Sequence, residues 1–194
     1  MKRHLFRLVC VAGLALAQLP AVAFATVMRH LSLEEHLALS VLVVRGRVVG
    51  ATSFVAEGGL PFTDTEVEVL EVIAGTAPAP EKLRVRQIKG MAGGTYRAVP
   101  GDAELWPGEE VVLFLHRLDG DVGYLTALGQ SKYLVDRPVG PPSPGGGGEP
   151  TVVRDVPLGE LHVPNGQAAV QRIEPPVALD AFVKTVRNLA RNAR

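Results

Sequence analysis

Apolar and polar residues alternate with a period of two along much of the chain between positions 41 and 136. This alternation is typical of β-strands with one buried face, whereas helices repeat about every 3.6 residues. Gly and Pro interrupt the runs and mark turns. The pattern predicts an all-β fold, a small barrel or sandwich of five or six short strands. The predicted strands are residues 41–51, 62–74, 82–88, 109–117, 124–128 and 131–136.

Two of these runs contain irregularities that predict local geometry. Gly46 lies in the middle of the first run, where a glycine indicates a sharp bend or the close approach of another backbone. In the second run, Val69 keeps the parity of the apolar positions before it, but Leu70 and Val72 have the opposite parity. One extra residue near 69–71 would reconcile the two halves, which predicts a β-bulge.

Helical signals flank the strand region on both sides. Ser32 and Glu35 have the spacing of a capping box, which predicts a short helix that continues to about Leu39. Residues 180–193 repeat apolar positions every three or four residues and have basic residues on the opposite face. This second pattern predicts a C-terminal amphipathic helix, whose positive charge near its end suits the helix dipole.

Two further segments are rich in Gly and Pro. Residues 89–108 show little periodicity and are predicted to be a long loop. In 138–150, ten of thirteen residues are Pro or Gly, which predicts a flexible loop or linker. We favour the tip of a hairpin between 134–137 and 152–155, because too few residues follow for a second core. The prediction is therefore one domain, residues 26–194.

The first 25 residues have the pattern of a secretory signal peptide. A basic start is followed by an apolar run over 8–17, a helix-breaking Pro20 and small residues that allow cleavage after Ala25. The alternative is an uncleaved anchor, because the apolar stretch counted to Met28 approaches membrane-spanning length. We expect cleavage, no membrane span in the mature chain, and a periplasmic or secreted bacterial protein.

Removal of this segment changes the charge and the thiol content. Lys and Arg together number 20 and so do Asp and Glu, but three of the basic residues lie in the first 25. The remainder has 17 basic and 20 acidic residues, a net charge of about −3. This balance disfavours binding to nucleic acids or anionic membranes. The only cysteine, Cys10, would be lost with the signal, which excludes thiol chemistry in the mature chain.

The order of features resembles that of a known group of proteins. It is similar to uncharacterised bacterial exported proteins with an OB-type barrel, which resemble netrin-like and metalloproteinase-inhibitor-like modules. The resemblance covers about residues 30–136 and implies a small OB-like barrel. The inhibitor modules chelate a protease's metal through a disulfide-bonded N-terminal cysteine, but Thr26 stands at that position, so no functional residue is carried over. The segments that carry the resemblance are LSLEEHLALS, VLVVRGRVV, TEVEVLEVIAG, WPGEEVVLFL and YLTALGQSKYLV.

Two aromatic residues in the 89–108 loop are the candidate partner-binding residues. Trp106, the only tryptophan, could lie exposed beside Tyr96 and stack on a sugar or a partner side chain. The alternative, which we favour for Trp106, is that it plugs one end of the barrel.

Other groups were weighed as sites of chemistry and give weaker signals. His30, Glu34 and His36 do not share one helix face, so we predict no metal site. Ser131 lacks the second glycine of a nucleophile elbow, and the glycines of 90–95 precede no helix that could bind phosphate. Five glutamates could act as paired acid and base, but their alternation favours cross-strand ion pairs with Arg45, Arg47, Arg84 and Arg86. These are Glu66, Glu68, Glu71, Glu109 and Glu110.

The sequence therefore favours a function without catalysis. We expect an exported binding module without a cofactor, whose partner is a protein or an envelope component that contacts the 89–108 loop. The alternatives are an inhibitor of a secreted protease that acts through a loop or an edge strand, and a hydrolase that uses carboxylate chemistry.

Overall fold

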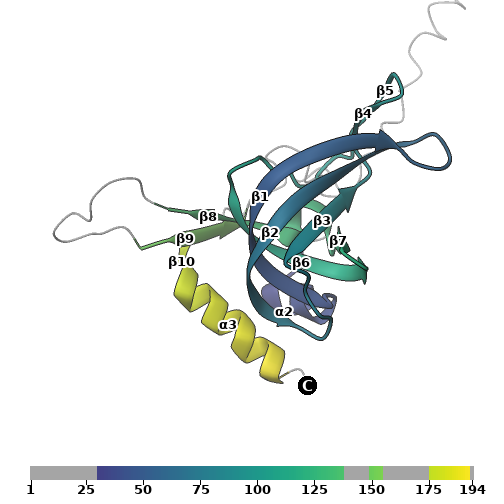
Figure 1. The fold of residues 1–194 in the computed structure, drawn as a ribbon. Coiled ribbons are helices and arrows are strands. Elements are labelled where there is room, and N and C mark those ends of the chain that lie inside the picture. The colour runs from purple at the N-terminus through teal and green to yellow at the C-terminus, as the bar shows by residue number, and fades with distance from the viewer. Residues whose placement is uncertain (1–29, 138–148, 155–174, 193–194) are drawn as a thin grey trace, which may run out of the picture.

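The computed structural model describes residues 30–137, 149–154 and 175–192 of the chain. This part is mostly β-structure in a large mixed sheet, with a short helix near its start and a second helix at its end (Figure 1), as the sequence predicted. Within these ranges no helix is both long enough and apolar enough to cross a membrane. The predicted signal segment, residues 1–25, lies outside the described residues.

The strands are longer and more numerous than the alternation predicted. Ten strands occur in the described ranges, and the first two have 14 and 15 residues. The far end of β1, residues 52–55, escaped prediction because both faces there are largely exposed and the sequence lacks an apolar period. The observed β2 extends the predicted run 62–74 by one residue at each end. The elements are α2 (Leu33–Ala38), β1 (Leu42–Val55), β2 (Pro61–Gly75), β3 (Lys82–Gln87), β4 (Gly90–Ala92), β5 (Thr95–Arg97), β6 (Glu110–Asp119), β7 (Val122–Leu125), a 3₁₀ turn (Leu128–Ser131), β8 (Lys132–Asp136), β9 (Thr151–Arg154), β10 (Val177–Ala178) and α3 (Leu179–Asn192).

Strand pairing is organised around β1. Its two edges pair antiparallel with β2 and with β6. β2 pairs with β3, β3 pairs in parallel with β7, and β7 pairs with β6, so each of these five strands pairs with at least two others of the group. β8, β9 and β10 extend the sheet from β6, and α3 packs against β2, β9 and β10.

The predicted β-bulge is confirmed in β2. Arg45 of β1 is opposite Glu71, and the next residue, Gly46, is opposite Val69, so Leu70 has no partner in β1. The extra residue explains why the apolar parity changes along β2, because it turns the two halves of the strand to different sides.

Gly46 allows β1 and β2 to approach closely, as its position in mid-strand predicted. A Cβ built at Gly46 would lie 2.4 Å from Cγ1 of Val67 and 2.8 Å from the carbonyl oxygen of Glu68. The second contact is with backbone, which cannot move aside without disturbing the strand pairing. The two strands therefore require a residue without a side chain here.

We predict that Gly46→Ala lowers the free energy of unfolding by about 2 kcal/mol, because the added methyl overpacks the β1–β2 contact. Urea denaturation followed by far-ultraviolet circular dichroism measures the loss. Gly50→Ala on the same strand is the matched control, since no atom lies within 4 Å of its Cβ position. Equal stability of the two variants would contradict the proposed close approach.

The side chains of β1 fill two separate cores. Val43 belongs to a core that includes Phe114, Tyr133 and the apolar face of α3, whereas its neighbours Leu42 and Val44 belong to a core between β1, β2, β3 and β6. The start of β1 is therefore apolar on both faces, as predicted. The buried residues of α3 are Leu179, Phe182, Val183 and Val186, which confirms the predicted amphipathic helix.

The segments on either side of the Pro and Gly tract pair with each other. Leu134 of β8 is opposite Val153 of β9, and Val135 is opposite Val152, in an antiparallel register. This pairing is the one expected if the tract joins two strands of a hairpin rather than two domains. Residues 138–148 themselves lie outside the described residues.

His36 of α2 is a buried polar residue in an apolar setting. The capping box is present as predicted, and it places His36 one turn into the helix with its ring 5.5 Å from that of Phe114. Neither ring nitrogen has a hydrogen-bond partner. Burial, together with the nearby charge of Arg154 and of His30, lowers the pKa of His36 to about 4 and outweighs the opposite effect of Glu35. The ring is therefore neutral at neutral pH.

The lowered pKa predicts that the protein loses stability as the pH falls. The unfolded chain binds a proton near pH 6.5 and the folded protein only near pH 4, so His36 destabilises the fold progressively between these values. The full effect is roughly 3 kcal/mol. His36→Leu should reduce the slope of unfolding free energy against pH in this window, measured by urea denaturation from pH 7 to 4. An unchanged slope would contradict the assignment.

Candidate functional site

A two-stranded hairpin over residues 90–97 replaces the first part of the loop predicted at 89–108. β4 and β5 pair antiparallel with Met91 opposite Tyr96, and Gly93 and Gly94 form the turn. Both glycines have positive φ, 58° and 76°, which is the conformation that a two-residue hairpin turn requires. The prediction of an irregular loop was wrong here because each strand has only three residues.

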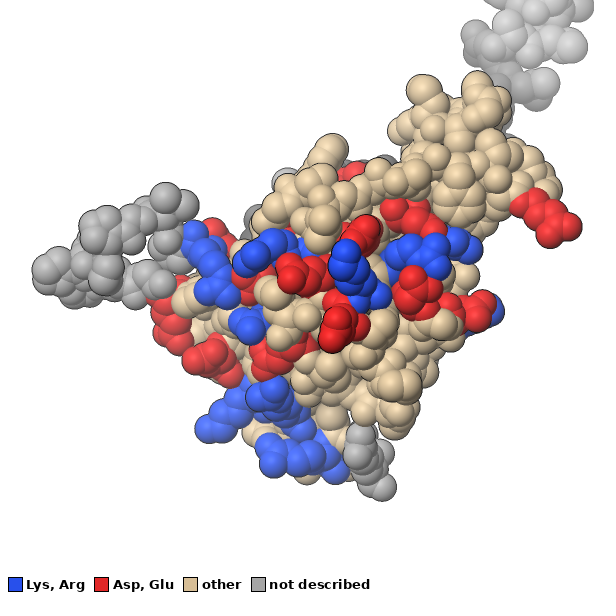
Figure 2. Space-filling view, in the orientation of Figure 1, with Lys and Arg blue, Asp and Glu red and all other residues tan. Residues whose placement is uncertain are grey.

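The hairpin joins the end of the β1–β2 pair to form an apolar tip, which we define as Val55, Leu60, Met91 and Tyr96. All four side chains are exposed, and those of Met91 and Tyr96 are 70% and 69% accessible. Figure 2 shows little charge around this end on the face that it presents, whereas Lys, Arg, Asp and Glu crowd the middle of the molecule. Exposed apolar residues gathered in this way are typical of binding surfaces.

Hydrogen bonds and a close contact fix the hairpin to the strands beneath it. The hydroxyl of Thr63 donates to the carbonyl oxygen of Lys89 at 2.7 Å and lies 2.8 Å from the hydroxyl of Ser53. Gly90 follows at once, and a Cβ there would lie within 2.5 Å of both hydroxyl oxygens. The glycine therefore lets the chain pass close to the side chains of Ser53 and Thr63, and it fixes the point where the hairpin starts.

The segment after the hairpin is buried rather than loose. Asp102, Ala103 and Leu105 are all buried. The carbonyl oxygen of Ala103 accepts hydrogen bonds from the side chains of Gln87 and Lys89. Burial raises the pKa of the Asp102 carboxyl group. This packing holds the C-terminal side of the hairpin against the ends of the strands.

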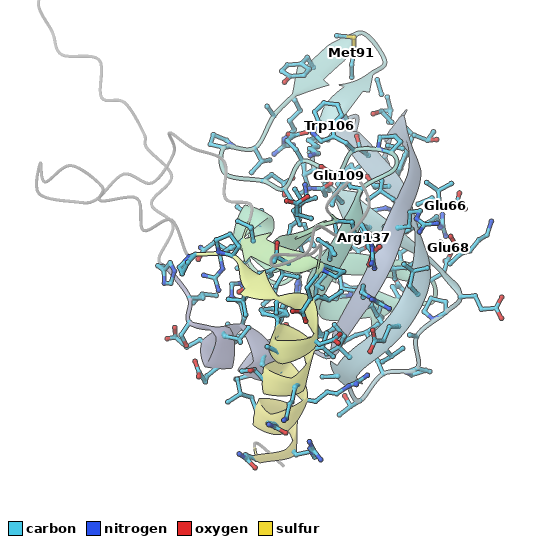
Figure 3. The ribbon with its side chains drawn as sticks, turned by 90° about the vertical axis from the view of Figure 1, so that its left-hand side faces the viewer. Glu66, Glu68, Met91, Trp106, Glu109 and Arg137 are labelled. Atoms are coloured by element: carbon cyan, nitrogen blue, oxygen red, sulfur yellow. The ribbon has the colours of Figure 1, made fainter. Side chains whose placement is uncertain are left out.

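Trp106 does not plug the end of the strands, so that prediction was wrong. Its side chain is 62% exposed, and the neighbouring Leu105 is buried in its place. The Trp106 backbone N–H donates to Glu109 at 3.0 Å, which closes a tight turn before β6. In the view of Figure 3, Trp106 lies between Met91 on the hairpin and Glu109. Both predicted partner-binding residues, Tyr96 and Trp106, are thus exposed.

A fully buried lysine supports this turn from below. The ammonium group of Lys132 lies 2.9 Å from the carboxylate of Glu109 and also donates to the backbone carbonyl of Glu104. No part of the Lys132 side chain is exposed, so its charge must be compensated by these groups. Lys132 therefore links β8 to both sides of the Trp106 turn.

We predict that Lys132→Met destabilises the protein by about 3 kcal/mol, because it removes the cation that pairs with Glu109 and the donor that binds the Glu104 carbonyl. The matched control is Lys82→Met, which removes an ion pair with Glu66 from a lysine whose side chain is 73% exposed. The control should cost less than about 1 kcal/mol. Urea denaturation of both variants compares them, and equal losses would contradict the role given to Lys132.

The glutamates considered as acid and base residues are mostly held by cations. Glu110 is buried and accepts two hydrogen bonds from Arg137, at 2.6 and 2.7 Å, which hold its pKa below the usual range. Arg45 lies 3.6 Å from Glu110 and 3.1 Å from Glu71. A general acid needs a raised pKa, so this geometry does not favour carboxylate catalysis at Glu110.

The predicted cross-strand ion pairs are correct for Arg45, whereas Arg84 and Arg86 of β3 pair with aspartates in place of the predicted glutamates. Arg84 binds Asp121 with two hydrogen bonds of 2.7 and 2.8 Å, and Arg86 binds Asp64 through two of 2.7 Å. The Arg86 pair is still a cross-strand pair, because Asp64 lies directly opposite on β2. The prediction failed for Arg84 because Asp121 comes from the turn before β7, which is next to β3 only in the folded sheet.

Three of the remaining candidate side chains make hydrogen bonds within the fold. The hydroxyl of Ser131 is buried and accepts a hydrogen bond from the Ala127 N–H at 2.6 Å. His30 contacts Arg154, and His116 contacts a backbone carbonyl. No group of three His, Cys, Asp or Glu side chains converges as a metal site within the described ranges. His162 lies outside the described residues.

Comparison with known proteins found no match. No protein-family model matches the chain, and no curated protein matches its sequence.

Proposed function

We propose that this protein is an exported, non-enzymatic binding module that docks on a protein partner through its apolar tip. The observation that carries the proposal is the exposure of Met91 and Tyr96 on a hairpin that the rest of the structure holds in place. Trp106 adds an exposed aromatic side chain toward the same end (Figure 3). Aromatic residues and methionine are the side chains most enriched at protein interfaces.

An OB-type barrel is part of the proposal. The ring of pairings β1–β2–β3–β7–β6–β1 supports the barrel, because strands that pair in a ring form a closed sheet without a free edge. The parallel pairing of β3 with β7, which completes this ring, supports it as well. The same order of elements supports the resemblance to netrin-like and metalloproteinase-inhibitor-like modules. In this proposal the barrel is a rigid support, and the loops at its end carry the function.

The shape of the tip favours a partner with a concave apolar site. A projecting hairpin presents Met91 and Tyr96 on one short element, and burial of each side chain would contribute about 2 kcal/mol. Methionine adapts to irregular pockets, and tyrosine can keep its hydroxyl group hydrated at the rim. Such a tip suits a cleft in another protein better than a flat polar surface.

The test uses a photoreactive benzophenone amino acid in place of Tyr96. The full mature chain is irradiated in an extract of bacterial envelope, and the adducts are resolved by mass. We expect a discrete adduct whose yield falls at least tenfold when Met91→Asp is added, because a charge on the tip cannot be buried against an apolar cleft.

The matched control has the same photoreactive residue in place of Leu39, an exposed leucine in the turn after α2. The control should give no discrete adduct. Equal adduct patterns from the two positions, or a pattern insensitive to Met91→Asp, would refute docking through the tip.

Inhibition of a secreted protease is a second candidate, and the hairpin itself favours it. β4 and β5 form a separate two-stranded sheet, so the hairpin keeps unpaired backbone groups that could add to a protease's substrate cleft. The adduct distinguishes the two functions, since an inhibitor would be crosslinked to a protease next to its catalytic residues and a simple binding module would not.

A further inference from the structure

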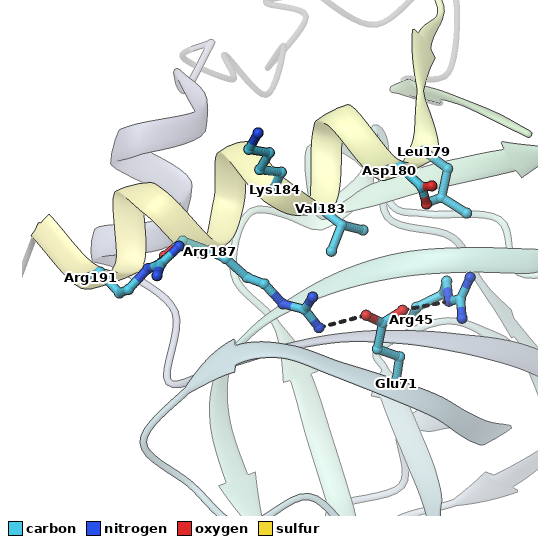
Figure 4. Close-up of a pocket in the computed structure, with 8 residues that line it drawn as sticks. All are labelled: Arg45, Glu71, Leu179, Asp180, Val183, Lys184, Arg187 and Arg191. Atoms are coloured by element: carbon cyan, nitrogen blue, oxygen red, sulfur yellow. Dashed lines mark hydrogen bonds and ion pairs between the residues drawn. The ribbon is translucent and has the colours of Figure 1, made fainter.

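Two hollows meet along α3, and they have opposite character. The first, of about 320 Å³, lies between α3 and the facing parts of β1 and β2 (Figure 4). It is lined mainly by charged side chains: Arg45, Glu71, Asp180, Lys184, Arg187 and Arg191, with Leu179 and Val183. Four cations and two carboxylates give this lining a net charge of +2, although the predicted mature chain as a whole has a net charge of about −3.

The positive charge in this hollow is concentrated on one part of α3. Glu71 is already shared by Arg45 at 3.1 Å and Arg187 at 2.6 Å, so it is largely neutralised. Lys184 has no ion-pair partner among the described residues, and Arg191 contacts only the neutral Asn188 and a backbone carbonyl. Lys184, Arg187 and Arg191 are spaced i, i+3 and i+7, which places them on one face of the helix.

Asp180, the remaining carboxylate, lies one helical turn before Lys184 and at the far end of the helix from Arg191. It is in the first turn of α3, eleven residues before Arg191, a separation of roughly 16 Å along the axis. Figure 4 shows Asp180 and Arg191 at opposite ends of the helix. An anion beside Arg187 and Arg191 would therefore meet positive charge with little repulsion from Asp180.

The second hollow, of about 450 Å³, is apolar and shares two residues with the first. Arg187 and Arg191 line both, and the other lining residues are Val72, Ile73, Ala74, Gly75 and Ala190. Val72 is 47% exposed, which is unusual for a valine in a strand that packs against a helix. Two guanidinium groups thus separate an electropositive hollow from an apolar one.

We propose that α3 and the end of β2 bind an anionic phospholipid. Its phosphate lies beside Lys184, Arg187 and Arg191, and its acyl chains begin over Val72 and Ala190. A phospholipid is the ligand whose anionic group is joined directly to an apolar part, as the two adjoining hollows require. Inorganic phosphate or an acidic peptide would use the first hollow and leave the second exposed.

This site is independent of the apolar tip. The basic residues of α3 gather at the lower end of the molecule in Figure 2, and the tip is at the opposite end. A protein bound to a membrane surface through α3 would therefore present its tip away from that surface. Failure of one proposal leaves the other unaffected, because the two experiments change different residues.

The experiment measures sedimentation of the mature chain with vesicles at low salt. Phosphatidylcholine vesicles containing a third phosphatidylglycerol are compared with pure phosphatidylcholine. We expect binding to the anionic vesicles only, weakened by added salt. The double variant Lys184→Glu with Arg191→Glu should lower the partition coefficient at least tenfold, because four units of charge change at the surface.

The matched control is Lys82→Glu with Arg117→Glu, which changes the total charge equally at two exposed residues that line neither hollow. This control should bind within twofold of the unchanged protein. Circular dichroism establishes that each variant is folded. Equal losses in the two double variants would show a general charge effect and overturn the site.

Soluble probes separate the phospholipid from other anions. Dihexanoyl phosphatidylglycerol, below its micelle concentration, should shift the backbone amide signals of both Lys184–Arg191 and Val72–Gly75 in nuclear magnetic resonance spectra. Glycerol phosphate and polyglutamate should bind at least tenfold more weakly. Equal affinity for glycerol phosphate or polyglutamate, or shifts confined to α3, would overturn the phospholipid proposal.

Discussion

The fold depends on the double pairing of the first half of β1. Residues Leu42–Arg47 pair with β2 on one edge and with β6 on the other, so the backbone of this segment is bonded from both sides. Within it, Val43 supplies one core, and Leu42 and Val44 supply the other. This is possible only because Gly46 lets β2 lie close and because Leu70 adds a residue to β2 at the point where the strands bend. The hairpin of the apolar tip contacts β1 and β2, and α3 packs against β2, so both depend on this strand pair.

The features that could be predicted from the sequence are those set by local physics. The alternation of apolar residues at Leu42 and Val44 indicates a strand with a buried face, and the change in the parity of apolar positions at Leu70 indicates a bulge. The capping box at Ser32 needs only residues three apart, and the apolar face of α3 repeats within the helix itself. In each of these cases the relevant neighbours are close in sequence or are repeated by a regular backbone.

What could not be predicted depends on partners that are distant in sequence. Arg84 meets Asp121 because β3 lies beside β7, and Lys132 can be buried because Glu109 comes from the turn before β6. The exposure of Trp106 depends on Leu105 taking the interior position. The hairpin was the exception, since Gly93 followed by Gly94 is a recognised turn signal, but three-residue strands carry too little alternation to support it.

The exposed position of Trp106 also determines what the intrinsic fluorescence of this protein can report. The chain has one tryptophan, and its indole is already largely in contact with solvent in the folded state. Its emission wavelength should therefore change little when the core unfolds. A bound partner that covers the turn between Leu105 and Glu109 would instead move the indole into a less polar environment. The protein therefore has an intrinsic fluorophore at the end of the sheet that bears the hairpin, and this fluorophore responds little to the unfolding of the interior.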